Sequence, residues 1–272
     1  MANDHPQDQA YYKSGFKLSV LDTHNWRKVA NAVPFVLPYL KKDQSLLDVG
    51  CGPGLILIDF ANYVNKVTGI EPTQELIDVA NKNLEATNDD DVKSRVKFQL
   101  GLAYEIPFPD DTFDVVFALQ VVIHLLDPVK GLAEMARVCK PGGYVLVIDA
   151  DMETTVVYPE QYRPDIMAYF NFKNTNLTSQ TQAGRALKLH GIKAGYKEAN
   201  LDVTALIWCI SEADKRRHWA DMYIARIKTS GEVDYEGEKE KWDKTIKAWD
   251  NWAQDPNSVF IVIHGQIVYH KP

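Results

Sequence analysis

The segment Leu46-Leu47-Asp48-Val49-Gly50-Cys51-Gly52-Pro53-Gly54 joins an apolar run to three glycines at alternate positions. The apolar run is typical of a strand buried inside a parallel sheet. Glycines at the end of such a strand let a ligand lie against backbone N–H groups and the N-terminus of a following helix. The segment therefore predicts a first strand, a cofactor loop and a first helix, in that order.

An acidic residue follows at the distance expected for a ribose contact. A second strand is predicted at 67–70 and ends on Glu71, about 20 residues beyond the loop. In nucleotide-binding sheets, a carboxylate at this place accepts hydrogen bonds from a ribose diol. Between loop and acid, apolar residues recur at helical spacing from Leu55 to Val64.

Strand and helix signals then alternate up to residue 149, which predicts an α/β fold with a doubly wound, Rossmann-like sheet. Residues 25–40 before the first strand have the spacing of an amphipathic helix that Pro34 and Pro38 bend or end. The expected elements of the core are strand 46–49, helix 54–65, strand 67–70, helix 74–87, strands 96–100 and 113–119, helix 129–139 and strand 144–149.

The second half of the chain adds a cap to this core. An aromatic, irregular segment covers 151–181, and a strand is expected at 205–210. Two charged helical segments precede the final strand signals, and the second carries tryptophans on one face, which indicates packing against the sheet or a neighbouring helix. These expectations comprise helix 182–191, helical segments 212–229 and 235–254, and final strands at 259–264 and 266–269.

Composition narrows the class of partner. The chain has 272 residues, 46% of them hydrophobic, which is enough for one large domain. A formal charge of −7 argues against a sequence-independent grip on nucleic acid, and no apolar run approaches the roughly 20 residues of a membrane span. Three scattered cysteines predict neither a disulfide framework nor a zinc site. A small-molecule partner and a cytoplasmic location are expected.

The spacing of the glycines argues against a dinucleotide loop. That loop has the pattern Gly-x-Gly-x-x-Gly, but here Leu55 stands where its third glycine belongs. The run Leu47-Asp-Val-Gly-Cys-Gly-Pro-Gly resembles the first motif of class I methyltransferases that use S-adenosylmethionine. This resemblance implies S-adenosylmethionine as the cofactor, a seven-stranded sheet, and a helical cap inserted before the last strand.

Two further stretches resemble the ubiquinone/menaquinone-biosynthesis type of these enzymes. The run from Phe98 to Val116 is similar to their third strand, adenine loop and fourth strand, and Arg137-Val-Cys-Lys-Pro-Gly-Gly to their turn before the fifth strand. The family commonly has an Asp where this chain has Leu102. The adenine contact would then rest on the backbone of Leu102 and Ala103 with apolar packing, or on a polar side chain such as Tyr104 or Glu105.

A narrower resemblance points to sulfur as the acceptor atom. His24-Asn-Trp-Arg, the run from Ala118 to His124, Asp149-Ala-Asp-Met-Glu-Thr and the stretch from Trp252 to Gly265 resemble a subgroup that includes the fungal gliotoxin bis-thiomethyltransferase. This resemblance implies S-methylation of a small thiol or dithiol metabolite in secondary metabolism. Oxygen, nitrogen or carbon acceptors remain the alternative within the class.

On this basis the whole chain, 1–272, is expected to be a single methyltransferase domain. Its parts are an N-terminal lid at 1–40, a cofactor-binding core at 41–150 and cap segments at 151–181 and 212–256. Aromatic residues near the start, including Tyr11, Tyr12 and Phe16, suggest that this end closes over bound cofactor.

Arg27 is a candidate clamp for the cofactor carboxylate, with a surface ion pair as the alternative. The expected cofactor-binding residues are Arg27, Gly50, Cys51, Gly52, Gly54, Glu71, Pro72, Leu102, Ala103, Leu119 and Gln120.

Two residues are candidates for the chemistry on the acceptor. A neutral imidazole at His124, just beyond the fourth strand, can deprotonate a thiol or hydroxyl; the alternative is a histidine that hydrogen-bonds its own loop. Asp151, like Asp149, follows the fifth strand and can contact the acceptor. No His or Cys cluster accompanies these acids, so a metal is not expected. Two other hypotheses stay open, a cofactor-binding protein without catalysis and a nicotinamide reductase.

Overall fold

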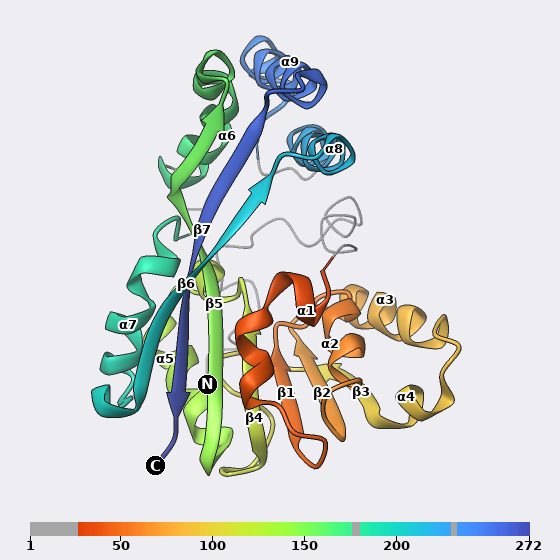
Figure 1. Cartoon of the computed structure of the whole chain (residues 1–272), viewed down its shortest axis with the longest axis vertical. Helices are drawn as coiled ribbons and strands as arrows, with labels where there is room; N and C mark the ends of the chain where they lie inside the picture. Colours follow the sequence, from red (N-terminus) through yellow and green to blue (C-terminus); the bar gives the residue numbers. More distant parts are fainter. Residues whose placement is uncertain (1–26, 176–179, 230–232) are drawn as a thin grey trace.

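A computed structural model describes residues 27–175, 180–229 and 233–272, and it contains a seven-stranded sheet in the order β3-β2-β1-β4-β5-β7-β6 (Figure 1). The strands from β3 to β5 are parallel, and β7 runs antiparallel to both β5 and β6. The expected doubly wound sheet is therefore confirmed. The strands are β1 Ser45–Val49, β2 Lys66–Glu71, β3 Val96–Leu100, β4 Phe113–Leu119, β5 Cys139–Tyr158, β6 Leu201–Ile210 and β7 Val259–His270.

The helices of the core follow the expected order, with shorter bounds at several ends. The acidic run after α3 forms the short helix α4 because Asp89 caps it, accepting from the N–H groups of Asp91 and Val92. The core helices are α2 Leu55–Phe60, α3 Gln74–Glu85, α4 Asp90–Arg95, α5 Pro128–Val138 and α7 Ala183–Lys193.

The segment before the sheet is not one helix. It forms a four-residue helix, α1 Val29–Ala32, and then a 3-10 helix, η3 Pro34–Tyr39. Proline has no N–H to donate and its ring clashes with the preceding turn, so Pro34 ends α1 and begins the tighter helix. The predicted lid residues Tyr11, Tyr12 and Phe16 lie outside the described residues.

β5 and β7 are longer than the sequence predicts. β5 continues from Cys139 to Tyr158, and β7 is a single strand, so the two expected final strands are one. Their pairing runs from Tyr144 opposite His270 to Tyr158 opposite Val259, with an irregularity between Asp151 and Val156. These strands carry the sheet beyond the parallel core and support the cap (Figure 1).

The cap consists of α6 Arg163–Thr175, α8 Ala213–Thr229 and α9 Lys239–Gln254. Figure 1 shows them gathered around the far ends of β5, β6 and β7. α8 and α9 lie between β6 and β7 in the chain, as predicted, whereas α6 occupies a segment with no expected helix. The tryptophan face of α9 is buried; the ring of Trp249 stacks on that of Tyr223 at 4.8 Å.

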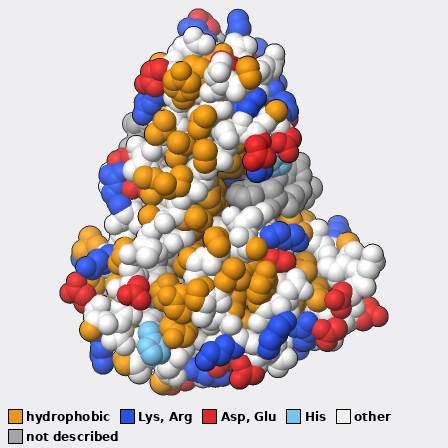
Figure 2. All heavy atoms as spheres, in the orientation of Figure 1, with side chains coloured by type: hydrophobic (Ala, Val, Ile, Leu, Met, Phe, Trp, Pro, Cys, Tyr) orange, Lys and Arg blue, Asp and Glu red, His pale blue; other side chains and the backbone are white. Residues whose placement is uncertain are grey.

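The surface carries mixed charge. Figure 2 shows Lys and Arg side chains interspersed with Asp and Glu around the lower part of one face, and hydrophobic side chains along the sheet between base and cap. None of the helices in the described ranges combines the length and apolar character that crossing a bilayer requires.

Candidate active site

One large pocket opens at the carboxyl ends of the parallel strands and extends under the cap. In open parallel sheets, ligands bind at this edge. Its two ends differ in chemistry. The end over the core is lined by Asp48 to Pro53, Leu55, Ile56, Glu71, Pro72 and Gly101 to Ala103; the end under the cap includes Met152, Tyr169, Phe170, Trp208, Trp219, Met222, Tyr223, Arg226, Val262 and His264.

The loop after β1 exposes its backbone to the pocket at Gly52. This residue has φ +52°, in the left-handed region, and a Cβ added there would meet nothing within 4 Å. Gly54 begins α2 with φ +78°, and a Cβ there would lie 2.5 Å from Phe98 Cζ. Gly52 therefore leaves room for a ligand against the main chain, whereas Gly54 allows close packing beneath it and does not line the pocket.

Glu71 is tied to this loop. Its Oε2 accepts from the Gly52 N–H at 3.1 Å, and its Oε1 from the Thr73 hydroxyl at 3.2 Å. Burial raises the pKa of Glu71 to about 7, against these hydrogen bonds, which lower it. Asp48 lines the same end of the pocket, and burial followed by the charge of Glu71 raises its pKa well above the usual value. The site thus holds a buried carboxyl group beside an open backbone.

The loop between β3 and β4, where the adenine contact is expected, forms part of the pocket wall at the core end. Leu102 and Ala103 line the pocket, but the other two candidates for the adenine contact do not. The Tyr104 hydroxyl accepts from the Asp127 N–H at 2.6 Å, and Glu105 is exposed. The first alternative, backbone and apolar packing at positions 102 and 103, is the one that the geometry favours.

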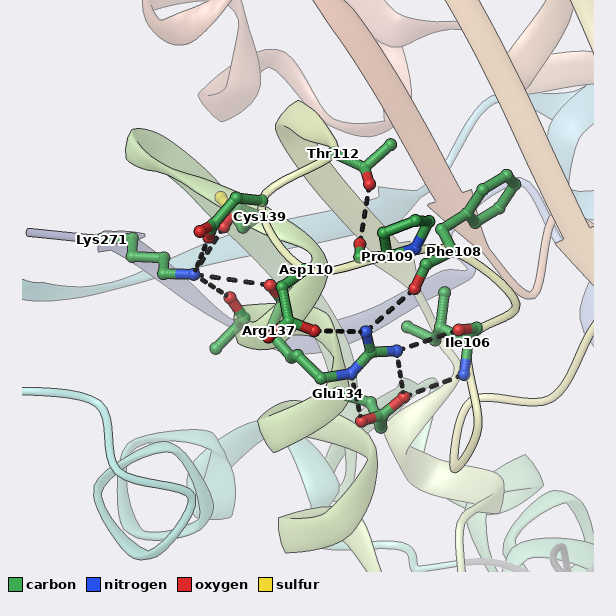
Figure 3. Close-up of polar contacts among 11 residues, drawn as sticks. Ile106, Phe108, Pro109, Asp110, Thr112, Glu134, Arg137, Cys139 and Lys271 are labelled. Atoms are coloured by element: carbon green, nitrogen blue, oxygen red, sulfur yellow. Dashed lines mark hydrogen bonds and ion pairs between the residues drawn. The ribbon is translucent and has the colours of Figure 1, made fainter.

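Arg137 fastens the same loop to α5 (Figure 3). Its guanidinium donates to the carbonyl oxygens of Ile106 and Phe108, both at 2.9 Å, and to the carboxylates of Asp110 and Glu134. Glu134 also accepts from the Ile106 N–H at 3.0 Å. The loop that carries Leu102 and Ala103 is therefore anchored by a network outside the pocket.

Arg27 and Gln120 meet at the boundary between the two ends. Arg27 Nη2 donates to Gln120 Oε1 at 2.6 Å, and Gln120 Nε2 lies 3.2 Å from His264 Nε2. Burial lowers the pKa of Arg27 to about 9, with a further decrease from the charge of Arg226. Arg27 is thus a buried cation in the pocket wall, not a surface ion pair.

Of the two catalytic candidates, only His124 lines the pocket. It ends a short 3-10 helix, η4 Val122–His124, directly after β4. Asp151 forms an ion pair with Arg185, whose Nη2 donates to its Oδ1 at 2.7 Å, and it is not among the described lining residues. Asp149 accepts from the N–H groups of Ile123 and Ala150, both at 3.0 Å, and burial raises its pKa to about 7. Asp149 therefore shapes the turn that presents His124.

The remaining cofactor candidates take different positions. Cys51, Pro72 and Leu119 line the pocket with Gly50 and Gln120, whereas Gly54 lies behind it. Sequence reasoning missed Trp208 on β6 and Arg226 on α8 because no local motif marks them, and it missed His264 on β7 as a pocket residue although His264 lies in the quoted stretch from Trp252 to Gly265. Among the described residues, no group of three or more His, Cys, Asp or Glu side chains is placed to hold a metal.

Comparison with known proteins shows the family to which this chain belongs. A model described as a methyltransferase domain matches residues 47–147. An uncharacterized methyltransferase of Schizosaccharomyces pombe is 39% identical over 98% of both chains. A probable methyltransferase of Aspergillus luteorubrus is 31% identical over 63% of this chain and 62% of its own.

Solved structures share the fold at low sequence identity. A putative methyltransferase from Bacillus halodurans has a TM-score of 0.60 and 20% identity, over 89% of this chain and 99% of that one. Phosphoethanolamine N-methyltransferase 2 of Haemonchus contortus, in complex with S-adenosylhomocysteine, has a TM-score of 0.57 and 18% identity, over 89% of this chain and 52% of that one.

Proposed function

This chain belongs to the S-adenosylmethionine-dependent methyltransferases, and on that premise we propose that its acceptor is a small-molecule thiol or dithiol. S-adenosylmethionine supplies a methyl group on a cationic sulfonium sulfur. The open backbone at Gly52 fits the methionine part of such a cofactor, and the buried carboxyl of Glu71 fits its ribose.

The proposed binding roles follow the pocket from end to end. The backbone of Gly50, Cys51 and Gly52 binds the methionine part, with Gly54 supporting the loop, and Glu71 accepts from the ribose hydroxyls. Arg27 pairs with the carboxylate. Pro72, Leu102 and Ala103 enclose the adenine ring, and Leu119 and Gln120 border the methyl-transfer position at the end of β4.

The cap end provides a chamber for the acceptor. Tyr169, Phe170, Trp208, Trp219 and Tyr223 are all buried and form much of its wall. Aromatic walls exclude water and hold an apolar molecule, and methyl transfer by in-line displacement depends on such positioning. A small, largely apolar acceptor is the class that this chamber fits.

Apart from His124, the titratable groups near the chamber are poor bases, and this observation supports sulfur as the acceptor atom. Burial, then the charge of Arg27, lowers the pKa of His264 to about 3, and the oxygens of Asp149 and Asp151 already accept hydrogen bonds. A thiol with a pKa of about 8.5 supplies a few per cent thiolate at neutral pH without help. A nucleophile that ionises by itself matches this chamber.

His124 supports the second candidate, an oxygen, nitrogen or carbon acceptor. It is a pocket-lining histidine placed where a general base would stand, and a phenol requires such a base more than a thiol does. A relative from Penicillium expansum, 29% identical over 48% of this chain, is named an O-methyltransferase.

The remaining features of the proposal concern the whole chain. We take residues 1–272 as one domain because one sheet connects core and cap. Mixed charge on the face in Figure 2 and the net charge of −7 support a protein that binds no nucleic acid. A cytoplasmic location is part of the same proposal. Its likeness to the gliotoxin-type subgroup supports a role in secondary metabolism.

The test compares acceptors and one variant. Purified protein receives methyl-deuterated S-adenosylmethionine with matched thiols, phenols and amines, and products are identified by mass spectrometry. We expect label on thiols. His124→Ala should slow thiol methylation less than about tenfold at pH 8, because the thiol ionises itself, whereas loss of a general base costs about 100-fold or more.

His270→Ala serves as the control, because His270 is exposed at the far end of β7 and outside the pocket. Label confined to phenols or amines would refute the sulfur proposal. Cofactor binding with no labelled product across the panel would favour a cofactor-binding protein without catalysis.

A further inference from the structure

Arg27, Gln120 and His264 form a chain of side chains from three distant parts of the sequence. The guanidinium donates to the Gln120 carbonyl oxygen, and the Gln120 amide nitrogen faces His264 Nε2. Within the described residues, Arg27 Nε has no hydrogen-bond acceptor. A buried guanidinium whose hydrogen bond goes to a neutral amide is costly unless a ligand supplies an anion at close range.

Gln120 is held by its backbone. Its φ of +55° lies in the left-handed region, which a residue with a Cβ adopts only when its surroundings require it. Its N–H donates to the Ile148 carbonyl oxygen at 2.9 Å, which fixes the turn after β4 beside β5. The strained turn therefore aims this side chain between Arg27 and His264.

The first hydrogen bond determines the second. A guanidinium can only donate, so the Gln120 atom that meets Arg27 must be the carbonyl oxygen. The amide nitrogen then faces His264 and donates to Nε2, which must be the unprotonated nitrogen. The imidazole proton consequently lies on Nδ1.

The surroundings of His264 keep it in this state. The side chain is fully buried, and its ring lies 3.9 Å from that of Trp208. The Arg27 guanidinium carbon lies 5.2 Å from the same Trp208 ring. Burial and the charge of Arg27 both oppose a second proton on the imidazole. His264 is thus a neutral acceptor at any pH at which the enzyme would work.

We propose that Gln120 and His264 are positioning residues that hold Arg27 against the carboxylate of the cofactor's methionine part. This inference rests on the proposed cofactor site and not on the identity of the acceptor. Neither residue needs to touch the reacting atoms; His264 fixes the orientation of the Gln120 amide, and the amide fixes the guanidinium.

Two ligands that differ in the amino-acid part test this role. S-adenosylhomocysteine carries the carboxylate, whereas 5′-methylthioadenosine does not. We expect His264→Phe, which keeps a ring beside Trp208 but removes the acceptor nitrogen, to weaken S-adenosylhomocysteine about tenfold in calorimetry, as for one charge-assisted hydrogen bond. Its affinity for 5′-methylthioadenosine should stay unchanged, and Arg27→Gln should behave in the same way.

Rescue and control variants separate positioning from general damage. His264→Gln retains an acceptor near the Nε2 position and should restore most of the loss. His270→Phe changes a histidine on the same strand that stacks on Tyr144 at 4.8 Å, away from the pocket, and should alter neither affinity. Nitrogen-15 NMR of the unmodified protein should show His264 protonated on Nδ1 alone.

Several outcomes would overturn the inference. Equal weakening of both ligands by His264→Phe would indicate a structural role only, and an Nε2-protonated imidazole would remove the proposed chain. Arg27→Gln could instead change how strongly the enzyme prefers to methylate 2-mercaptobenzoate over its methyl ester while S-adenosylhomocysteine binding stays unchanged. That result would assign Arg27 to a carboxylate of the acceptor. The measurements with S-adenosylhomocysteine and 5′-methylthioadenosine need no acceptor, so failure of thiol methylation would leave them interpretable.

Discussion

Glu71 lies in the middle of the proposed cofactor site, and the fold raises its pKa. Burial opposes its charge, while the Gly52 N–H and the Thr73 hydroxyl favour it. The cofactor's ribose would add donors to the charged form. Glu71 therefore costs stability in the protein without ligand, which is expected of a group arranged for binding.

The pH dependence of stability tests this cost. The folded pKa of Glu71 is raised from 4.5 to about 7, so its stabilising contribution is complete below about 4.5 and is lost as pH rises through about 7. Above pH 7.5, Glu71→Gln should therefore raise the free energy of unfolding by about 1–3 kcal/mol, as measured by urea unfolding.

The raised pKa of Asp149 also lowers stability as pH rises. The effect of Glu71 is therefore measured as the difference in the free energy of unfolding between the variant and the wild type at each pH. Glu71→Gln should also weaken S-adenosylhomocysteine binding at pH 8. Parallel stability curves from pH 4.5 to 8 would show that Glu71 has no raised pKa.

Gly52 makes a second prediction at the level of one residue. Alanine there must take a left-handed φ, which costs about 1–2 kcal/mol, although its Cβ meets nothing. Gly142 is a matched control, with φ +77° and an equally open Cβ position outside the pocket. Both alanine variants should lose similar stability in urea, but only Gly52→Ala should weaken S-adenosylhomocysteine binding. Equal affinities in the two variants would contradict the placement of the cofactor against this backbone.

At the scale of elements, the loop between β3 and β4 depends on an anchor that does not touch the pocket. Arg137→Gln removes the hydrogen bonds and ion pairs that hold this loop to α5 (Figure 3). It should lower both the free energy of unfolding, by about 1–3 kcal/mol, and the affinity for S-adenosylhomocysteine, because Leu102 and Ala103 lose their fixed position.

Arg95→Gln is the matched control. Arg95 likewise donates to carbonyl oxygens, those of Ala61, Val64 and Asn65, and pairs with Asp91, but it lies outside the pocket. It should lower stability and leave the affinity unchanged. Calorimetry that finds the same affinity in both variants would show that the loop is not needed for cofactor binding.

The elements of the core were predictable because each carries its own local signal. Leu46 to Val49 and the glycines after them mark a strand and its turn without reference to the rest of the chain. α6 carries no such local signal. Its aromatic residues Tyr169 and Phe170 line the pocket, and Phe170 also packs against Tyr223 of α8, a contact that only the folded cap creates. The length of β5 was also hidden, because it depends on pairing with β7, more than 100 residues away.

At the scale of the whole molecule, the pocket joins the core, which carries the cofactor-loop motif, to the cap. Most of the expected cofactor residues line it, whereas Trp208 on β6, Arg226 on α8 and His264 on β7 enter through packing between strands and helices far apart in sequence. Asp151 illustrates the same limit, since its partner Arg185 comes from α7. Local spacing cannot report such contacts.

The most direct test of the central claim is methylation of 4-mercaptophenol, which offers a thiol and a phenol on one ring of a size that suits the aromatic chamber. The protein is incubated with methyl-deuterated S-adenosylmethionine at pH 7.5, and fragmentation mass spectrometry locates the label. We predict a labelled methyl group on sulfur, with oxygen unlabelled. A label on oxygen, with sulfur unmodified, would contradict it and assign the chamber to hydroxyl acceptors.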